Sequence, residues 1–168
     1  MLSAHLLQRI ERNWDRIAAQ VIAERDRDPK LQHYRALGDH EIRARARDLA
    51  ENLANWLNQS DEASLAAHYE RLGEVRFHEG IPLNELIHKI IIIKRVIRQH
   101  ATDNNPALTP VEIYAELDLL RTMAAFFDFV IYRVSRGYET ALRREMAAEA
   151  ALPADLRGQS SALRAFAS

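Results

Sequence analysis

The strongest constraint on the fold is an uninterrupted helical pattern that fills the last third of the sequence. Thr109, Pro110 and Glu112 combine an N-cap hydroxyl, a proline at the first helical position and a glutamate at the third, which together indicate a capping box. After this start, apolar residues alternate at spacings of four and three: Ile113, Leu117, Leu120, Ala124, Phe127, Ile131, Val134 and Tyr138. A helix over residues 110–150 would be about 60 Å long. So long a heptad pattern predicts either a coiled-coil-like contact with a second copy or a kink at Gly137.

Four amphipathic segments precede this helix. Apolar residues recur every three or four positions over residues 6–21, 39–57, 61–80 and 82–104, as expected of helices that bury one face. Asp28-Pro29 ends the first segment, and residues 29–38 are expected to form a loop. The sequence therefore predicts an all-α, single helical-bundle domain of about five helices over residues 1–150. Residues 151–168 are expected to form a flexible tail.

The fourth segment contains four consecutive isoleucines at positions 90–93. Such a run would also suit a buried strand, but roughly 20 residues follow Pro82 without a breaker, and strands rarely run so long. A helix that is apolar on all sides is expected to be central and buried. Gly80 is expected at the left-handed position that ends the preceding helix, and Pro82 at the first turn of this one.

Composition narrows the classes of function. The 168 residues include 23 Lys+Arg and 24 Asp+Glu, for a net charge of −1, which argues against a nucleic-acid partner because such domains carry a basic excess. Cysteine is absent, so disulfides, thiolate metal sites and cysteine nucleophiles are excluded. No apolar run approaches the length of a spanning helix, and no signal peptide is evident. We therefore expect a cytoplasmic protein without a membrane partner.

Carboxylates and histidines at helical spacings raise a metal site as one hypothesis. The candidate ligands are Glu70, Glu74, His78, Glu85 and His88. The first three would share one helix face, and the last two form a Glu-x-x-His motif, which carboxylate-bridged di-iron bundles use twice. This chain has one such motif. The favoured interpretation is therefore that the glutamates pair with nearby cations such as Arg71 and Lys89, and no metal cofactor is expected.

The histidines raise two further hypotheses, a haem site and a phosphoacceptor site. His78, His88 and His100 are candidate haem ligands by their position near the isoleucine segment, but no diagnostic spacing supports haem. His40, followed by Glu41, resembles the phosphoacceptor box of a sensor histidine kinase over four residues only. His40 is more readily explained as a solvent-facing residue in the first turn of a helix.

Asp128 lies among aromatic residues and is a candidate for partial burial. A buried carboxylate must find a partner or become neutral. Arg76 is the expected partner, and this pair would tie the isoleucine segment to the last helix. A polar stripe is expected beside the heptad pattern: Arg121, Asp128, Tyr132, Ser135 and Arg136. An ion pair is favoured over a ligand site, and no nucleophile–base pair or phosphate loop is apparent in the sequence.

Four stretches resemble the N-terminal domain of the RsbR/RsbRD family of stress-regulator co-antagonists. They are RIERNW at 9–14, LGEVRFHEGIPLNEL at 72–86, FFDFVIY at 126–132 and RGYE at 136–139. The resemblance implies a helical sensory or interaction domain, globin-related in some members but without haem, and commonly dimeric. In such proteins the domain is joined to an output module, whereas only a short tail is expected here. The candidate structural or ligand-binding residues within these motifs are Arg76, Gly80, Pro82, Asp128, Tyr132 and Arg136.

The predicted function is a non-enzymatic signalling or stress-response module of a bacterium, acting as a homodimer and on an unidentified signalling protein. The expected dimer face comprises Ile113, Leu117, Leu120, Phe127, Ile131 and Val134. The alternative is a sensor of a small ligand, haem or metal that uses a cavity between the isoleucine helix and the last helix.

Overall fold

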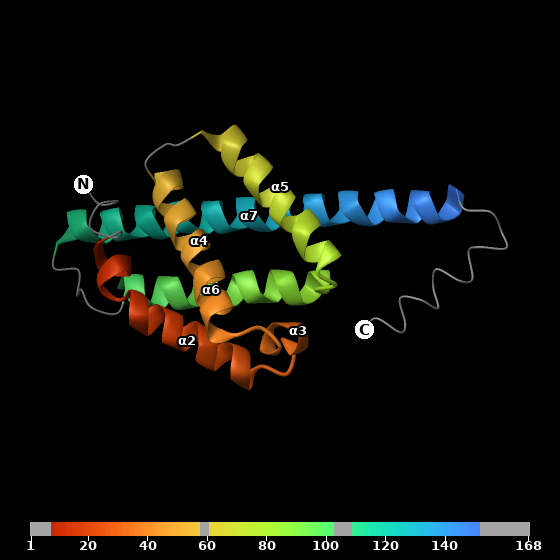
Figure 1. Ribbon diagram of the computed structural model, residues 1–168. Helices are drawn as coiled ribbons and strands as arrows, with labels where there is room; N and C mark the ends of the chain where they lie inside the picture. The colour runs from red at the N-terminus through yellow and green to blue at the C-terminus, as the bar shows by residue number, and fades with distance from the viewer. Residues whose placement is uncertain (1–7, 58–60, 103–108, 152–168) are drawn as a thin grey trace.

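The computed structural model describes residues 8–57, 61–102 and 109–151 (Figure 1). Its helices are α2 (Trp14–Arg27), α3 (Gln32–Arg35), α4 (Asp39–Leu57), α5 (Glu62–His78), α6 (Leu83–Thr102) and α7 (Pro110–Ala151). Residues 8–12 are also helical, and a turn at Asn13 separates them from α2. The described residues contain no strand, so the all-α prediction is confirmed. Residues 152–168 of the predicted tail lie outside the described residues, and the domain boundary stays a prediction.

The segment predicted as a loop, residues 29–38, contains the short helix α3. Leu31 and Tyr34 are buried, so this segment contributes to the core. Glu85 of α6 holds it in place: Oε2 accepts a hydrogen bond of 3.0 Å from the backbone N–H of His33, and Oε1 lies 2.8 Å from Nδ1 of the same residue. The Glu85 carboxylate of α6 therefore fixes residues 29–38 in place. Local periodicity could not predict this contact, because its two partners are 52 residues apart.

Helix α7 is one continuous helix that spans the molecule (Figure 1). Its closest approach is to α5, and two glycines make that approach possible. A Cβ on Gly137 would lie 1.8 Å from the backbone oxygen of Glu70, and a Cβ on Gly73 would lie 2.1 Å from that of Val134. Gly137 therefore permits a close helix crossing. The helix continues through this position without interruption.

The core is formed by side chains from α2, α3, α4, α5, α6 and α7. Phe126 and Phe127 of α7 are fully buried, and Trp56 of α4 packs against Phe126 with ring centroids 5.9 Å apart. In α6, Ile92 and Ile93 are buried, whereas Ile91 is 44% exposed. The isoleucine helix is thus central, but it is not buried on all sides.

The turn between α5 and α6 confirms the role predicted for Gly80. This residue has φ of 73° and its N–H donates to the Phe77 carbonyl, while the N–H of Ile81 donates to the Arg76 carbonyl. These two bonds form a Schellman motif. Pro82 lies one residue before α6 and accepts from the N–H of Leu86 at 3.0 Å, so it occupies the N-cap position. The hydroxyl of Tyr138 in α7 donates to the Ile81 carbonyl at 3.0 Å and ties this turn to the last helix.

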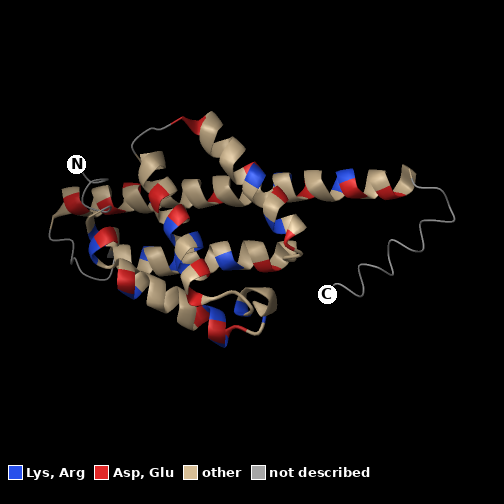
Figure 2. Ribbon diagram, in the orientation of Figure 1, with Lys and Arg blue, Asp and Glu red and all other residues tan. Residues whose placement is uncertain are grey.

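The start of α7 is capped as the sequence predicts. The backbone N–H of Thr109 donates to Glu112 Oε2 at 2.9 Å, and the N–H of Glu112 donates to the Thr109 hydroxyl at 3.3 Å. This reciprocal pair is a capping box. Acidic and basic residues are both spread over the helices (Figure 2). Among the described helices, none combines the length and apolarity that crossing a bilayer requires.

Candidate functional site

A cavity of about 280 Å³ lies among α3, α4, α5 and α6. Most of its wall is apolar, and a few charged or polar side chains converge on it, a combination typical of small-molecule sites. The apolar lining is Ala44, Leu49, Leu72, Leu86, Ile90 and Ile93. The polar lining is Tyr34, Arg45, Asp48, His68, Arg76 and Lys89. We call this space the α3–α6 cavity.

Lys89 is the most unusual residue of the α3–α6 cavity. It lies on α6 three residues after Leu86 and four before Ile93, so helical geometry places it on the buried face. The residue is 6% exposed, and its ammonium lies 4.3 Å from the centroid of the Tyr34 ring. No hydrogen bond from this ammonium to another described residue is present. Burial, followed by repulsion from Arg45 and Arg76, holds the pKa of Lys89 well below its ordinary value.

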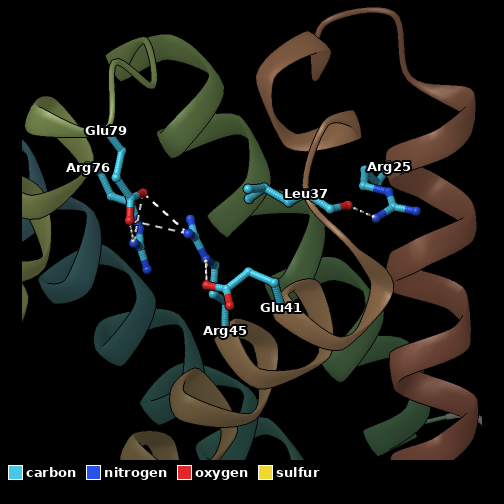
Figure 3. Close-up of polar contacts among 6 residues, drawn as sticks. All are labelled: Arg25, Leu37, Glu41, Arg45, Arg76 and Glu79. Atoms are coloured by element: carbon cyan, nitrogen blue, oxygen red, sulfur yellow. Dashed lines mark hydrogen bonds and ion pairs between the residues drawn. The ribbon is translucent and has the colours of Figure 1, made fainter.

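Two arginines and two glutamates form a chain of ion pairs beside Lys89 (Figure 3). Arg45 Nε donates to Glu41 at 2.6 Å, and its Nη2 donates to Glu79 at 3.3 Å. Arg76 Nη1 donates to both carboxylate oxygens of Glu79, at 2.8 and 2.9 Å. The hydrogen bond from Arg45 lowers the pKa of the Glu41 carboxyl. The third nitrogen of the Arg45 guanidinium, Nη1, is buried and has no partner.

The charges near Lys89 do not cancel when its ammonium is protonated. Arg45 and Arg76 contribute two positive charges, Glu41 and Glu79 contribute two negative charges, and the ammonium remains uncompensated. Asp48, which also lines the cavity, is engaged by His68 Nε2 at 3.2 Å. Apart from these ion pairs, the α3–α6 cavity therefore presents the Lys89 cation and the Asp48 carboxylate in a partly open, mainly apolar wall.

Tyr34 closes the cavity on the α3 side. Its ring stands beside the Lys89 ammonium, and burial raises the pKa of its phenol to about 12. A neutral phenol adds no negative charge to the site. Tyr34 therefore offers the ammonium the face of an aromatic ring, which is a weaker partner than a carboxylate.

A second candidate surface runs along the outside of α7. Its large apolar side chains are exposed, and it consists of Ile113, Tyr114, Leu117, Tyr132, Leu142 and Met146. We call it the α7 stripe. It extends over about 50 Å of helix at 1.5 Å per residue. A run of exposed apolar side chains on one helix is typical of a protein-contact surface.

Four of the five candidate metal ligands take part in ion pairs or hydrogen bonds with other side chains. Arg133 Nη1 donates to Glu70 at 3.0 Å, and Arg144 Nη1 donates to Glu74 at 3.0 Å, so these carboxylates join α5 to α7. Glu85 holds His33 as described above, and His88 Nε2 lies 2.6 Å from Asp28 Oδ2. Hydrogen bonding to His88 lowers the pKa of Asp28. His78 is exposed, and no three His, Asp or Glu side chains of the described residues are grouped to hold a metal.

The predicted haem and kinase histidines have ordinary surroundings. His100 Nε2 lies 3.0 Å from the Gln20 side-chain oxygen, and His40 is exposed in the first turn of α4. The four-residue likeness of His40 to a phosphoacceptor box thus corresponds to a solvent-facing position, as the favoured interpretation held.

The predicted pair of Arg76 and Asp128 is wrong. Arg76 binds Glu79, three residues along the chain, whereas Asp128 lies 3.2 Å from Lys94 and its side chain is 72% exposed. Asp128 falls on the outer face of α7 although its neighbours Phe126 and Phe127 are buried. Tyr132 and Arg136 are also exposed. Asp128→Ala is therefore expected to cost no more stability than the loss of an exposed aspartate.

The predicted dimer face is divided by the fold. Ile113 and Leu117 are 46% and 53% exposed, and Leu120 and Ile131 are half-buried. Phe127 and Val134 are fully buried against the chain's own core, so including them in a contact between copies is wrong. The heptad repeat serves the core of the domain along its middle and leaves apolar side chains exposed near its start.

Sequence reasoning did not identify Lys89 or Arg45 as site residues. The signal for Lys89 was present, because a lysine lay on the same helical face as Leu86 and Ile93. Arg45 offered no such signal, since its role depends on Glu79, which α5 brings to it from a distant part of the chain.

The comparisons with known proteins give one match. The sequence model of the family described as "RsbT co-antagonist protein rsbRD N-terminal domain" matches residues 11–152. No curated protein and no solved structure matches the chain.

Proposed function

The chain belongs to the RsbRD N-terminal domain family of stress-response signalling regulators, and from this premise we propose that it acts in the cytoplasm as a non-enzymatic interaction module that forms a homodimer through the α7 stripe. The domain would exert its regulatory effect by binding another signalling protein. The family supports the regulatory role. The observation that carries the dimer is the exposure of large apolar side chains along one side of a continuous helix.

A second copy of the chain is the occupant that suits the α7 stripe best. The stripe lies on a single long helix, and an antiparallel copy with its axis near residue 130 would bring Leu117 opposite Leu142. The same arrangement would bring Arg121 close to Glu139 of the other copy, which joins opposite charges. Long helices with apolar repeats associate in this way because each copy covers the other's exposed surface.

The test is sedimentation of the wild type and of an Ile113→Glu/Leu117→Glu variant over a hundredfold range of concentration. The wild type is expected to sediment as a dimer that dissociates on dilution, and the variant as a monomer, because buried glutamates would lack partners in the contact. Ile91→Glu is the matched control, since Ile91 is 44% exposed and Ile113 is 46% exposed. A wild-type monomer throughout, or a dimer unaffected by the paired glutamates, would reject the α7 stripe.

A further inference from the structure

We propose that the α3–α6 cavity is a binding site for one small organic monoanion, a carboxylate with a short apolar chain. The carboxylate would pair with the ammonium of Lys89 and with Nη1 of Arg45, and the chain would lie against the leucines and isoleucines of the wall. This proposal stands on the cavity alone and is independent of the dimer proposed above.

The buried charge is the first argument. Lys89 is a residue with 6% exposure, and its ammonium has no hydrogen-bond acceptor among the described residues, so this charge loses much of its hydration in the folded protein. The nearby Arg45 has a buried Nη1 that also lacks an acceptor. Arg45 of α4 and Lys89 of α6 both line the α3–α6 cavity. An oxyanion is the chemical group that satisfies both at once.

The count of charges selects a monoanion. Glu41 and Glu79 offset Arg45 and Arg76, so protonated Lys89 is the cation that these ion pairs leave for the ligand. A dianion such as a phosphate monoester would bring an excess negative charge close to Glu79. The lining carboxylate Asp48, held by His68, would repel a second negative charge further.

The wall of the cavity selects an apolar body. Five of its lining residues are leucine or isoleucine, and they come from α4, α5 and α6: Leu49, Leu72, Leu86, Ile90 and Ile93. A volume of about 280 Å³ is at the lower end of the range for small-molecule sites. Such a space fits a straight-chain acid of about six to eight carbons better than a bare inorganic anion, because apolar walls gain free energy by covering apolar groups.

The test is isothermal titration of the full chain with hexanoate, hexan-1-ol and inorganic phosphate as separate probes. Hexanoate is expected to bind, and the alcohol and phosphate to bind at least about tenfold more weakly. Lys89→Met should remove hexanoate binding while circular dichroism shows the helices intact. Lys94→Met is the matched control, since Lys94 lies on the same helix, lines no part of the cavity and pairs with Asp128.

A second variant tests the apolar half of the site without changing its charge. Ala44→Leu reduces the space in the cavity and is expected to weaken octanoate binding more than acetate binding. The proposal is overturned if no acid binds, if hexan-1-ol binds as tightly as hexanoate, if phosphate binds better than hexanoate, or if Lys89→Met leaves hexanoate binding unchanged. Dimerisation would be unaffected by any of these outcomes, so failure here is distinguishable from failure of the α7 stripe.

Discussion

Lys89 is a residue whose charge works against folding. An ammonium in the interior loses its hydration, and the face of the Tyr34 ring restores only part of the lost interaction. Arg45 and Arg76 add repulsion, which Glu41 and Glu79 offset. A methionine of similar length would fill the same space without this cost. Lys89 therefore has the properties of a residue kept for binding at some expense of stability.

Replacing Lys89 by methionine is expected to raise the free energy of unfolding at neutral pH by about 1 kcal/mol or more. The pH dependence should change as well. Between the depressed pKa of folded Lys89 and its ordinary value of 10.5, the unfolded chain binds more protons, so wild-type stability rises with pH at up to about 1.4 kcal/mol per unit. Urea denaturation from neutral pH to about pH 9.5 measures this slope. This pH range lies below the pKa of Tyr34, so the phenol does not contribute to the slope. The Lys89→Met variant should lose the rise, and an equal slope in both proteins would contradict the depressed pKa of Lys89.

The candidate site was only partly predictable from sequence. Glu85 and Lys89 are four residues apart on a helix, a spacing that favours a local ion pair. Glu85 instead accepts two contacts from His33, and Lys89 faces the cavity. The spacing along a helix indicates which side chains are close enough to pair. Contacts with other helices in the folded protein determine which of these pairs form. The same reason explains why Glu70 and Glu74 bind arginines of α7.

At the scale of the helices, the crossing of α5 and α7 organises the fold. Gly73 and Gly137 let the two backbones touch, and ion pairs from Glu70 and Glu74 flank the contact. Sequence alone associated Gly137 with a kink, because a glycine weakens a helix wherever it lies. The close approach depends on a second glycine 64 positions earlier (137 − 73), and single-helix periodicity contains no information about that pairing.

Gly137→Ala is expected to lower the free energy of unfolding by about 2 kcal/mol or more, because the new methyl group would meet the backbone of Glu70 and force the helices apart. Alanine has a higher helix propensity than glycine, so Gly137→Ala would raise the free energy of unfolding if Gly137 served only as a hinge. A decrease would instead indicate that Gly137 is needed for the close packing of α5 and α7. Gly38→Ala is the control for the added methyl group, since a Cβ at Gly38 meets nothing within 4 Å. Because Gly38 is the N-cap of α4, where glycine is favoured over alanine, this variant should lower the free energy of unfolding by about 1 kcal/mol at most, which is less than for Gly137→Ala. Thermal unfolding of both variants decides the matter, and a stabilised Gly137→Ala protein would contradict the close crossing.

The long helices were predictable because each carries its own signals. The capping box of α7, the left-handed Gly80 and the three-four periodicity are local features, and all are present in the structure. Helix α3 was missed because four residues contain too few turns for periodicity to appear. The burial of Leu31 and Tyr34 arises from tertiary contacts, which the sequence pattern of that segment does not reveal.

At the scale of the whole molecule, α7 has three parts with different surroundings. Its buried residues lie between Met123 and Ala141, where α5 and α6 cover it. The segments on either side carry Ile113, Leu117, Leu142 and Met146 of the α7 stripe, and these side chains are exposed. Helix ends with few buried contacts open locally more often than a packed centre. A second copy on the stripe would cover both ends at once.

Hydrogen exchange measured by mass spectrometry should therefore divide α7 into a protected centre and two faster ends. Amides of residues 110–120 and 143–151 are expected to exchange faster than those of residues 123–141 in dilute protein, because local openings suffice to expose them. Raising the protein concentration should slow exchange at both ends of the wild type together, since dimer formation stabilises them by mass action. The Ile113→Glu/Leu117→Glu variant should show the same fast ends at every concentration. Protection that is uniform along α7 and independent of concentration would mean that the ends are held within a single chain, and the α7 stripe would then need no second copy.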